Sequence, residues 1–308
     1  MTAFQRQKIG WLDMVILLSL SAIWGSAFGA IKIAVDNTGP FTVVALRSVL
    51  ALLAITLYLC FQPHHLPKWR ELVHKRLFFV GITGTLAPFM LIAWAELYLP
   101  SSLAGLLMGS GPLLTLIGGH YITKDEKMSG LRVLAVLTGL CGVIVLFADG
   151  FVKMGTSAVL AQFALVCAAM CYSASNLSVK PLTHLSPVII AGSGFFIASF
   201  IALPLAFIIE EPEFASISAE VWLALFWLGF VSTAFAFSLR YVLIRRAGAG
   251  FTSNVGYLIP LMAVAIGWFA LDEEIETVKL IALAVIVVSI IISQRAGVML
   301  KPQSAAKS

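Results

Sequence analysis

One stretch of this sequence occurs twice at a fixed separation. A proline, a run of apolar residues and an acidic group extend from Pro112 to Glu126 and again from Pro260 to Glu274, so both ends are 148 residues apart. The same separation relates further pairs, which are Lys32 with Lys180, Gly81 with Gly229, Thr85 with Thr233, and Phe89 with Phe237. A repeat of half the chain is far longer than the unit of a solenoid. We therefore expect two similar halves that face each other, residues 1-150 and residues 151-308.

The composition excludes a soluble domain. Of the 308 residues, 60% are hydrophobic and 11% are charged, with a mean hydropathy of +0.99, whereas a soluble domain carries about 25% charged residues. The net charge of +5 does not indicate nucleic acid, because the basic residues lie in short loops between apolar runs. We expect the lipid bilayer, and no nucleic acid, to surround this chain.

Ten runs are long and apolar enough to cross a membrane, since a helical span needs about 20 mostly apolar residues. Each run is continuously apolar, whereas the strands of a barrel would alternate. The sequence therefore predicts an all-α integral membrane fold of ten transmembrane helices. The runs cover residues 13–33, 41–61, 77–97, 102–122, 130–148, 156–176, 187–209, 220–240, 250–271 and 278–294.

The basic residues predict the orientation. If the N-terminus is cytoplasmic, 16 of the 20 lysines and arginines fall on the cytoplasmic side, as the positive-inside rule requires, and both termini are cytoplasmic. Five helices per half is an odd number, so the second half enters the membrane from the opposite side. We expect two inverted five-helix repeats, which is the plan of many secondary transporters. The alternative is a channel, but the sequence has no ring of like charges and no filter-like loop.

Several motifs resemble one family of carriers. The segment Trp24-Gly25-Ser26-Ala27-Phe28 resembles the WGxxF signature of the EamA group in the drug/metabolite transporter superfamily. Gly39-Pro40 followed by Leu46-Arg47 is similar to the second-helix pattern of that group, and the two proline-to-glutamate stretches match its spacing in helices four and nine.

The resemblance implies a ten-helix carrier that exports small metabolites, often amino acids or related compounds, across the bacterial cytoplasmic membrane. The second half departs from the pattern. Residues from Tyr172 to Asn176 replace WGxxF, and Phe195 stands where Arg47 would be. We expect any site between the halves to be asymmetric.

Arg47 is the most informative charged residue. It lies about seven residues inside its predicted helix, about 10 Å by helical rise, where a charge costs at least a few kcal/mol unless it faces a cavity or a partner. We interpret it as a cation that holds a substrate carboxylate or controls a gate. The structural alternative is an arginine that extends outward or caps backbone carbonyls.

Three other charged residues are candidates for coupling or gating. Glu96 ends the third predicted helix, where a buried carboxylate could carry a proton or pair with Arg47; the alternative is an exposed interfacial glutamate. Lys32 and Lys180 end helices one and six, where they guard the two mouths or fix the helix ends. Acidic residues after helices four and nine are expected to cap the following helices; these are Asp125, Glu126, Glu273 and Glu274.

Polar and aromatic residues at membrane depth complete the predicted substrate site, although packing between helices is an equally good account of any single one. They are Trp24, Trp94, Tyr172, Asn176, Tyr241, Asn254 and Tyr257. Pro112 and Pro260 are expected to bend their helices and to free a carbonyl one turn earlier. The pairs Gly25 with Gly29 and Gly105 with Gly109 form small-residue faces that predict close helix packing.

The remaining residues give no sign of a cofactor or a metal. Cys167 and Cys171 share a helical face, but we interpret them as small apolar packing residues. The histidines have no metal-ligand spacing, and the sequence has no phosphate-binding loop of an ATP-driven pump and no convergent acid–base motif. An enzyme acting on lipid-linked substrates is therefore disfavoured.

The leading hypothesis is a metabolite exporter that works by alternating access on a small-molecule substrate, driven by proton antiport or by the substrate gradient alone. The alternative is a proton-coupled antiporter of multiple cationic drugs, like the small four-helix members of the same superfamily. Those members use a glutamate in the middle of their first helix. Here the first helix has Asp13 only at its start, so we rank this alternative lower.

Overall fold

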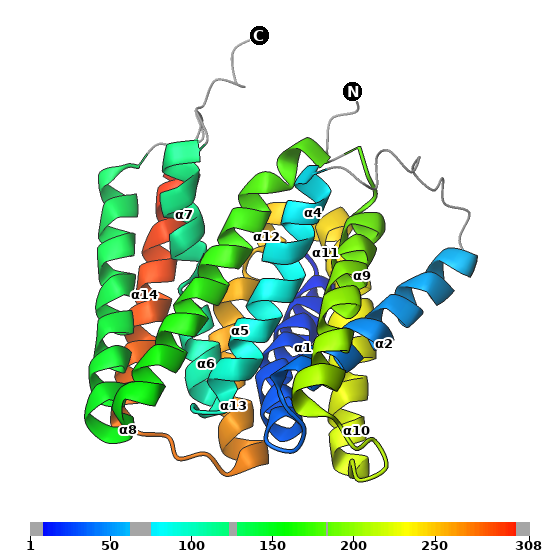
Figure 1. The fold of residues 1–308 in the computed structure, drawn as a ribbon. Coiled ribbons are helices and arrows are strands. Elements are labelled where there is room, and N and C mark those ends of the chain that lie inside the picture. Colours follow the sequence, from blue (N-terminus) through cyan, green and yellow to red (C-terminus); the bar gives the residue numbers. More distant parts are fainter. Residues whose placement is uncertain (1–8, 62–74, 123–127, 183, 300–308) are drawn as a thin grey trace.

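The computed structural model describes residues 9–61, 75–122, 128–182 and 184–299. In these ranges the chain is all-helical and contains no strand. Figure 1 shows its helices as a single bundle. They are α1 (Trp11–Val35), α2 (Pro40–Phe61), α4 (Lys75–Gly81), η1 (Ile82–Leu86), α5 (Ala87–Glu96), α6 (Ser101–Met108), α7 (Gly111–Ile122), α8 (Gly130–Ser178), η2 (Lys180–Leu182), α9 (Pro187–Leu205), η3 (Ala206–Glu210), α10 (Ala219–Phe226), η4 (Trp227–Phe235), α11 (Ala236–Ala247), α12 (Ala249–Thr252), α13 (Val255–Leu271) and α14 (Thr277–Met299).

These helices supply the ten apolar segments that the sequence predicts. Eight are long and apolar enough to cross a membrane, and two shorter apolar helices, Val255–Leu271 and Thr277–Ser293, complete the set. Helix α8 contains two of the eight segments, Gly130–Ala148 and Gly155–Ser178. The chain bends between them at Gly155, whose φ of 78° is a left-handed backbone conformation that glycine adopts without strain. By length and composition, these segments allow the chain to cross a membrane several times.

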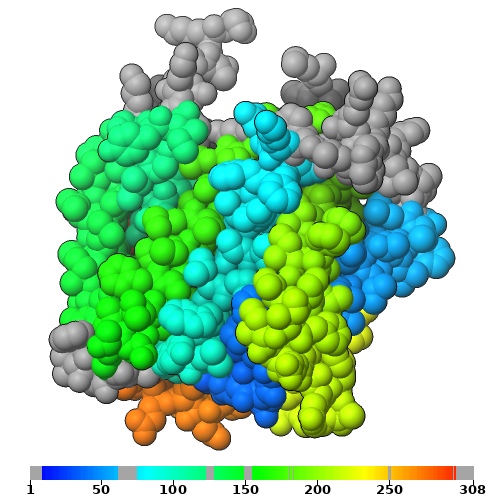
Figure 2. All heavy atoms as spheres, viewed as in Figure 1, coloured from blue at the N-terminus to red at the C-terminus, as the bar shows by residue number. Residues whose placement is uncertain are grey.

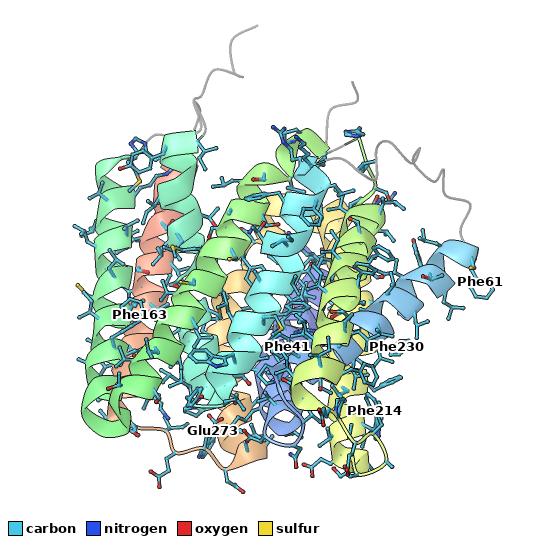
Figure 3. The ribbon with its side chains drawn as sticks, in the orientation of Figure 1. Phe41, Phe61, Phe163, Phe214, Phe230 and Glu273 are labelled. Atoms are coloured by element: carbon cyan, nitrogen blue, oxygen red, sulfur yellow. The ribbon has the colours of Figure 1, made fainter. Side chains whose placement is uncertain are left out.

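The outer surface of the bundle is apolar. Large hydrophobic side chains project from it, among them Phe61, which is 79% exposed, and Phe163, which is 57% exposed (Figure 3). On the face drawn in Figure 2, parts of α8, α4 and α9 lie side by side. Such a surface suits lipid, since hydrocarbon chains do not penalise exposed apolar side chains.

Glycines let two helices approach α13 closely. A Cβ atom on Gly25 of α1 would lie 2.5 Å from the Cβ of Met262, and one on Gly105 of α6 would overlap the Cβ of Ala263. The second glycine of each predicted small-residue face also meets α13, Gly29 at Leu271 and Gly109 at Pro260. Helix α13 therefore lies against both α1 and α6, with backbones close together.

The helices are interrupted in ways that the prolines only partly account for. The turn at Gly109 and Ser110 separates α6 from α7 directly before Pro112, whereas Pro260 lies inside the continuous helix α13. Three π-helical segments, η1, η3 and η4, were not anticipated. Residues 82–86 of η1 and residues 230–234 within η4 are related by the 148-residue separation. Such segments leave backbone carbonyls free to accept other donors and often occur at functional sites.

Candidate functional site

Arg47 points into the bundle. It lies two turns into α2, its side chain is only 8% exposed, and its Cζ atom is 3.8 Å from the centroid of the Phe89 ring on α5. A guanidinium over an aromatic face is attracted by the ring quadrupole. The Nε atom is buried and has no hydrogen-bond partner among the described residues. The arginine therefore does not reach the surface, and part of its hydrogen-bonding capacity is unused.

Phe89 is shared with the residue that corresponds to Arg47 in the second half. The ring of Phe195 on α9 lies 6.3 Å from that of Phe89, centroid to centroid. Arg47 and Phe195 are 148 residues apart, so equivalent positions of the two halves meet at one aromatic ring. One position carries a charge and the other does not, which makes this centre chemically asymmetric.

Two further predicted residues interact with Arg47. Tyr172 of α8 and Glu96 of α5 are the ionisable groups with electrostatic interactions to its guanidinium. Both groups are therefore within electrostatic range of Arg47, although Glu96 lies about two helical turns beyond Phe89 along α5. No ion pair within 4.0 Å joins Arg47 to Glu96, although both side chains are described. The structure therefore lacks the direct pair between these two residues that the sequence allowed.

Glu96 is buried, not interfacial. Its side chain is 0% exposed, and neither carboxylate oxygen has a hydrogen-bond partner among the described residues. Its backbone carbonyl accepts a hydrogen bond of 2.7 Å from Nζ of Lys32, which also forms an ion pair of 2.8 Å with Asp36. Lys32 therefore ties the end of α1 to the end of α5. Lys180 opens the turn η2 after α8, and its side chain lies outside the described atoms.

A carboxylate of the second half caps a helix of the first half. Glu273 accepts hydrogen bonds from the backbone N–H groups of Ser101 and Ser102, at 2.8 and 3.0 Å, and from the Ser101 hydroxyl at 2.7 Å. These are the first residues of α6. The expectation that Glu273 caps the following helix is wrong, because the preceding loop turns it toward α6 instead; Asp125 and Glu126 lie outside the described residues.

Glu210, at the end of η3, makes the same kind of contact with α2. It accepts hydrogen bonds from the backbone N–H groups of Phe41 and Thr42, at 2.8 and 2.7 Å, and from the Thr42 hydroxyl at 2.7 Å. Gly39 has a φ of 147° and borders the Glu210 carboxylate so closely that a Cβ atom would overlap it.

We call Glu210 and Glu273, with the helix starts that they cap, the two carboxylate bridges. Both lie at the end of the bundle where α1 leads into α2 and α13 leads into α14, which is the lower end in Figure 1, and Figure 3 labels Glu273 there. They join segments about 170 residues apart, at separations of 168 to 172 residues. The two halves are therefore joined by charge-assisted hydrogen bonds at this end.

An ion pair joins the halves at the opposite end. Nε of Arg246, at the end of α11, lies 2.7 Å from Oδ1 of Asp13, at the start of α1. The other oxygen of Asp13 accepts from the backbone N–H of Gly10. The Arg246 side chain is 43% exposed, so water can reach this contact.

The WGxxF-like segment contacts the π-helical segment η4. Nε1 of Trp24 donates to the backbone carbonyl of Ser232 at 2.9 Å, and Nε1 of Trp227 donates to the hydroxyl of Ser26, also at 2.9 Å. The π-helical geometry therefore presents a carbonyl to Trp24, and the indole of Trp24 acts as a hydrogen-bond donor between helices.

The other predicted substrate residues are dispersed. Trp94 and Tyr257 are partly buried against the main core, and the Trp94 ring lies 5.2 Å from that of Tyr98. Asn254 lies at the break between α12 and α13. Tyr241 is 49% exposed and Asn176 is also exposed. Only Tyr172 of the aromatic and amide candidates joins Arg47.

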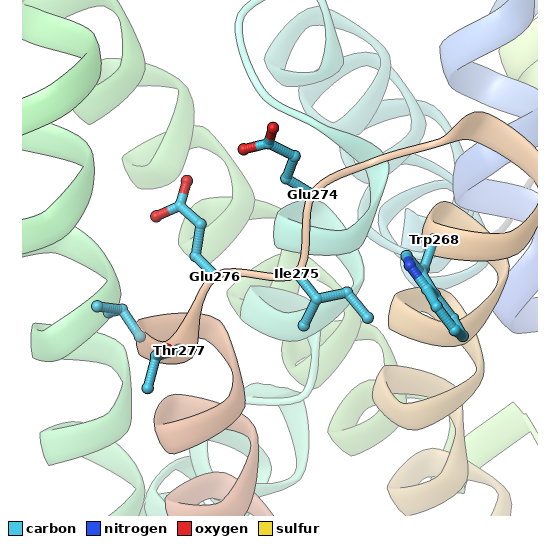
Figure 4. Close-up of a pocket in the computed structure, with 6 residues that line it drawn as sticks. Trp268, Glu274, Ile275, Glu276 and Thr277 are labelled. Atoms are coloured by element: carbon cyan, nitrogen blue, oxygen red, sulfur yellow. The ribbon is translucent and has the colours of Figure 1, made fainter.

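Sequence reasoning missed Phe89 as the aromatic residue that contacts Arg47. Its pairing with Phe237 across the 148-residue separation was the available signal, but an apolar helix gives no sign of which phenylalanine faces a charge. The depression shown in Figure 4 is elsewhere, between the end of α13 and the start of α14, and is lined by Trp268, Glu274, Ile275, Glu276, Thr277 and Val278. In the described ranges, no group of three His, Cys, Asp or Glu residues could hold a metal ion.

Comparison with known proteins identifies the family. The model of the EamA-like transporter family matches residues 11–148 and again residues 159–294. The chain belongs to this family. The resemblance noted in the sequence motifs is thereby confirmed.

Relatives of this transporter are similar over most of their length. It is 21% identical over 275 residues to the uncharacterized transporter YoaV of Bacillus subtilis, covering 89% of this chain and 93% of the relative. It is 25% identical over 281 residues to the uncharacterized inner membrane transporter YedA of Escherichia coli, covering 90% and 88%. These names point to transport rather than to enzymatic activity.

A solved crystal structure shares the fold. It superposes with a TM-score of 0.66 and 19% sequence identity, covering 94% of this transporter and 99% of that chain. The arrangement of helices is therefore common to both, while the side chains around Arg47 have to be interpreted from this chain alone.

Proposed function

We propose that this protein is a secondary transporter that exports small carboxylate-bearing metabolites, amino acids or related compounds, by alternating access. The observation that carries the proposal is Arg47, a buried cation whose Nε has no hydrogen-bond partner and which forms no ion pair with a described carboxylate. A substrate carboxylate would supply both the missing acceptor and the missing charge. Tyr172, which interacts with Arg47, would bound the same site.

Alternating access is supported by contacts that recur when the two halves are exchanged. A shift of 148 residues relates α1 to the second part of α8, and α7 to α13. If each helix is replaced by its counterpart in the other half, the contact of α1 with α13 becomes the contact of α8 with α7, and both contacts are extensive. Helices α2 and α9 are counterparts of each other, so their contact is unchanged by the exchange. This reciprocity is what a pair of inverted repeats requires, and it favours a mechanism in which the halves exchange conformations.

We further propose that the transporter lies in the cytoplasmic membrane with both termini in the cytoplasm. The charge distribution supports this orientation, and a relative is named as an inner membrane transporter. The carboxylate bridges then lie on the external side, where they join the two halves.

The test is counterflow in liposomes preloaded with an unlabelled panel of amino acids and other small carboxylates. We expect saturable exchange with a labelled external pool. Arg47→Ala should lower the apparent affinity for carboxylate substrates about 10- to 100-fold, because a hydrogen bond to a charged group contributes about 1.5–3 kcal/mol. Arg245→Ala, at an exposed arginine of α11, is the matched control. Undiminished exchange in the Arg47→Ala variant would show that Arg47 is structural.

One observation favours the second candidate, a proton-coupled antiporter of cationic compounds. The buried carboxylate of Glu96 could attract a cation. Arg47 interacts with the same carboxylate and would repel such a substrate, so we rank this function second. Linear flux of every carboxylate tested, together with resistance to quaternary-ammonium dyes on expression, would reverse this ranking.

A further inference from the structure

Glu96 is the least exposed charged residue of the described part of the chain. Its side chain is 0% exposed, compared with 4% for Asp13 and 8% for Arg47. Asp13 accepts hydrogen bonds from Arg246 and from the backbone of Gly10, whereas both oxygens of Glu96 are buried without a partner. The two buried acids thus have opposite environments. Both carboxylate oxygens of Asp13, at the start of α1, accept hydrogen bonds, whereas neither oxygen of Glu96, at the end of α5, has a donor.

Chemistry restricts what an empty buried carboxylate can bind. An ionised carboxylate without hydrogen-bond donors in an apolar environment is so costly that the group neutralises instead. A metal ion is disfavoured, because no group of three His, Cys, Asp or Glu side chains in the described ranges could hold one. With no exposed surface on this side chain, a proton is the ligand that fits without rearrangement.

The surrounding charges come from three other parts of the chain. Lys32 and Asp36 belong to α1, Arg47 to α2, and Glu273 to the connection after α13; all four interact electrostatically with Glu96. Of the four, Lys32 also forms a hydrogen bond with Glu96, at its backbone carbonyl. Yet Nζ of Lys32 is bound to Asp36 and to the Glu96 backbone carbonyl, not to the Glu96 carboxylate. Lys32 is therefore beside the acid but is held by other acceptors.

We propose that Glu96 binds the coupling proton of this transporter and that Lys32 becomes the counter-ion of its carboxylate when the proton leaves. In the described conformation the acid is neutral and Lys32 remains with Asp36. When Glu96 releases its proton to water, Lys32 exchanges the carboxylate of Asp36 for that of Glu96. The exchange needs only a movement of the Lys32 side chain, because its ammonium group already contacts Glu96.

The position of Glu96 links the release of its proton to opening of the end of the bundle that carries the carboxylate bridges. Ser101 follows Glu96 after one short connection, and Ser101 is held by Glu273 in one of the carboxylate bridges. Separating Glu273 from Ser101 would open the end of α5 to water. Proton release and opening would then occur together, which is how a carrier couples a proton to its cargo. This inference rests on the proposed function, since coupling presupposes transport.

Infrared difference spectroscopy tests the proton site without a transport assay. Purified protein in lipid is compared with Glu96→Gln at neutral pH. We expect the wild type to show the C=O stretching band of a protonated carboxylic acid, and the band to be missing from the variant. Glu213→Gln, at an exposed glutamate, should leave the band in place. The absence of any band attributable to Glu96, from mildly acidic to mildly alkaline buffer, would overturn the proposal.

Transport across a pH gradient tests the coupling. We expect an imposed gradient to change the rate of net substrate movement in the wild type and in Glu213→Gln, but not in Glu96→Gln. Glu96→Asp, which keeps a carboxyl group, should retain part of the response and covers the case in which the glutamine variant folds poorly. Lys32→Gln should shift the pH at which the infrared band disappears, because the carboxylate loses its counter-ion.

The two arms separate the two hypotheses. A band from Glu96 without counterflow of any substrate would contradict the proposed function while supporting the proton site. Two results would overturn the proton site and leave the proposed function standing. In the first, Glu96→Gln shows counterflow and responds to a pH gradient as the wild type does. In the second, a sodium gradient changes the rate of net substrate movement in the wild type as much as a pH gradient does.

Discussion

Glu273→Gln tests whether a side chain of the second half holds a helix of the first. The carboxylate accepts three hydrogen bonds, from Ser101 N at 2.8 Å, Ser101 Oγ at 2.7 Å and Ser102 N at 3.0 Å. Glutamine has the same shape, but it replaces one acceptor oxygen by an NH₂ group that faces donors. One backbone N–H at the start of α6 is then left without an acceptor.

The expected loss follows from these bonds. A hydrogen bond to a charged group contributes about 1.5–3 kcal/mol, and loss of an N-cap costs about 0.5–2 kcal/mol. Because a glutamine oxygen at the Oε1 position still accepts both bonds from Ser101 and only the bond from Ser102 is lost, we expect a loss of about 2–4 kcal/mol in the free energy of unfolding. For a chain of this size, with about 2 °C per kcal/mol, the melting temperature should fall by about 4–8 °C.

The assay is thermal unfolding of purified protein in detergent, followed by intrinsic fluorescence. Glu274→Gln is the matched control, since the neighbouring side chain is exposed and only its backbone carbonyl accepts a bond, from Lys279. A double-mutant cycle with Ser101→Ala should show coupling between hydroxyl and carboxylate. Melting temperatures of Glu273→Gln and Glu274→Gln within about 1 °C of each other would refute the reasoning.

Three further substitutions probe the packing of the bundle, each with thermal unfolding as the measurement. Gly105→Val should lower the melting temperature by about 2–6 °C, because overpacking costs about 1–3 kcal/mol, whereas Gly130→Ala, with open space around its Cα, should change it little; equal effects would contradict close packing on α13. Trp24→Phe removes one hydrogen bond and should cost about 1 kcal/mol, so an unchanged melting temperature would show that this bond contributes nothing. Arg246→Gln breaks the pair with Asp13, and its effect should shrink as salt is added, because salt screens exposed pairs; an effect independent of salt would argue against an electrostatic origin.

The fold could be predicted because the membrane leaves few choices. Each apolar run has to satisfy its own backbone, so helices of about 20 residues follow directly, and the ends of the predicted run 130–148 coincide with those of the span Gly130–Ala148. The π-helical segment η4 was not predictable. No residue in Trp227–Phe235 differs in kind from those of the helices around it, and the segment depends on how η4 packs against α2 and α1.

Residues of the site could be predicted only where burying the side chain costs much free energy. Arg47 and Glu96 attracted attention because charges within apolar runs need a reason, and each of them is buried. Tyr241 was indistinguishable from Tyr172 by sequence, since helices that are apolar all round do not reveal which face turns inward; the structure exposes the first. The partner of Glu273 was also beyond the sequence, because a cap between halves depends on the path of a loop.

The meeting of Arg47 and Phe195 at one phenylalanine has a consequence for the energetics of a transport cycle. If the halves exchange conformations as proposed, the substrate meets a differently constructed site in each state, and its affinities on the two sides of the membrane cannot be equal. Because a closed cycle without an energy source can do no net work, that ratio of affinities must equal the ratio between the orientation equilibria of the empty and the loaded carrier. Replacing Phe195 by arginine would bring the two sites closer in chemistry, and the empty and the loaded carrier would then divide their time between the two orientations in more similar proportions.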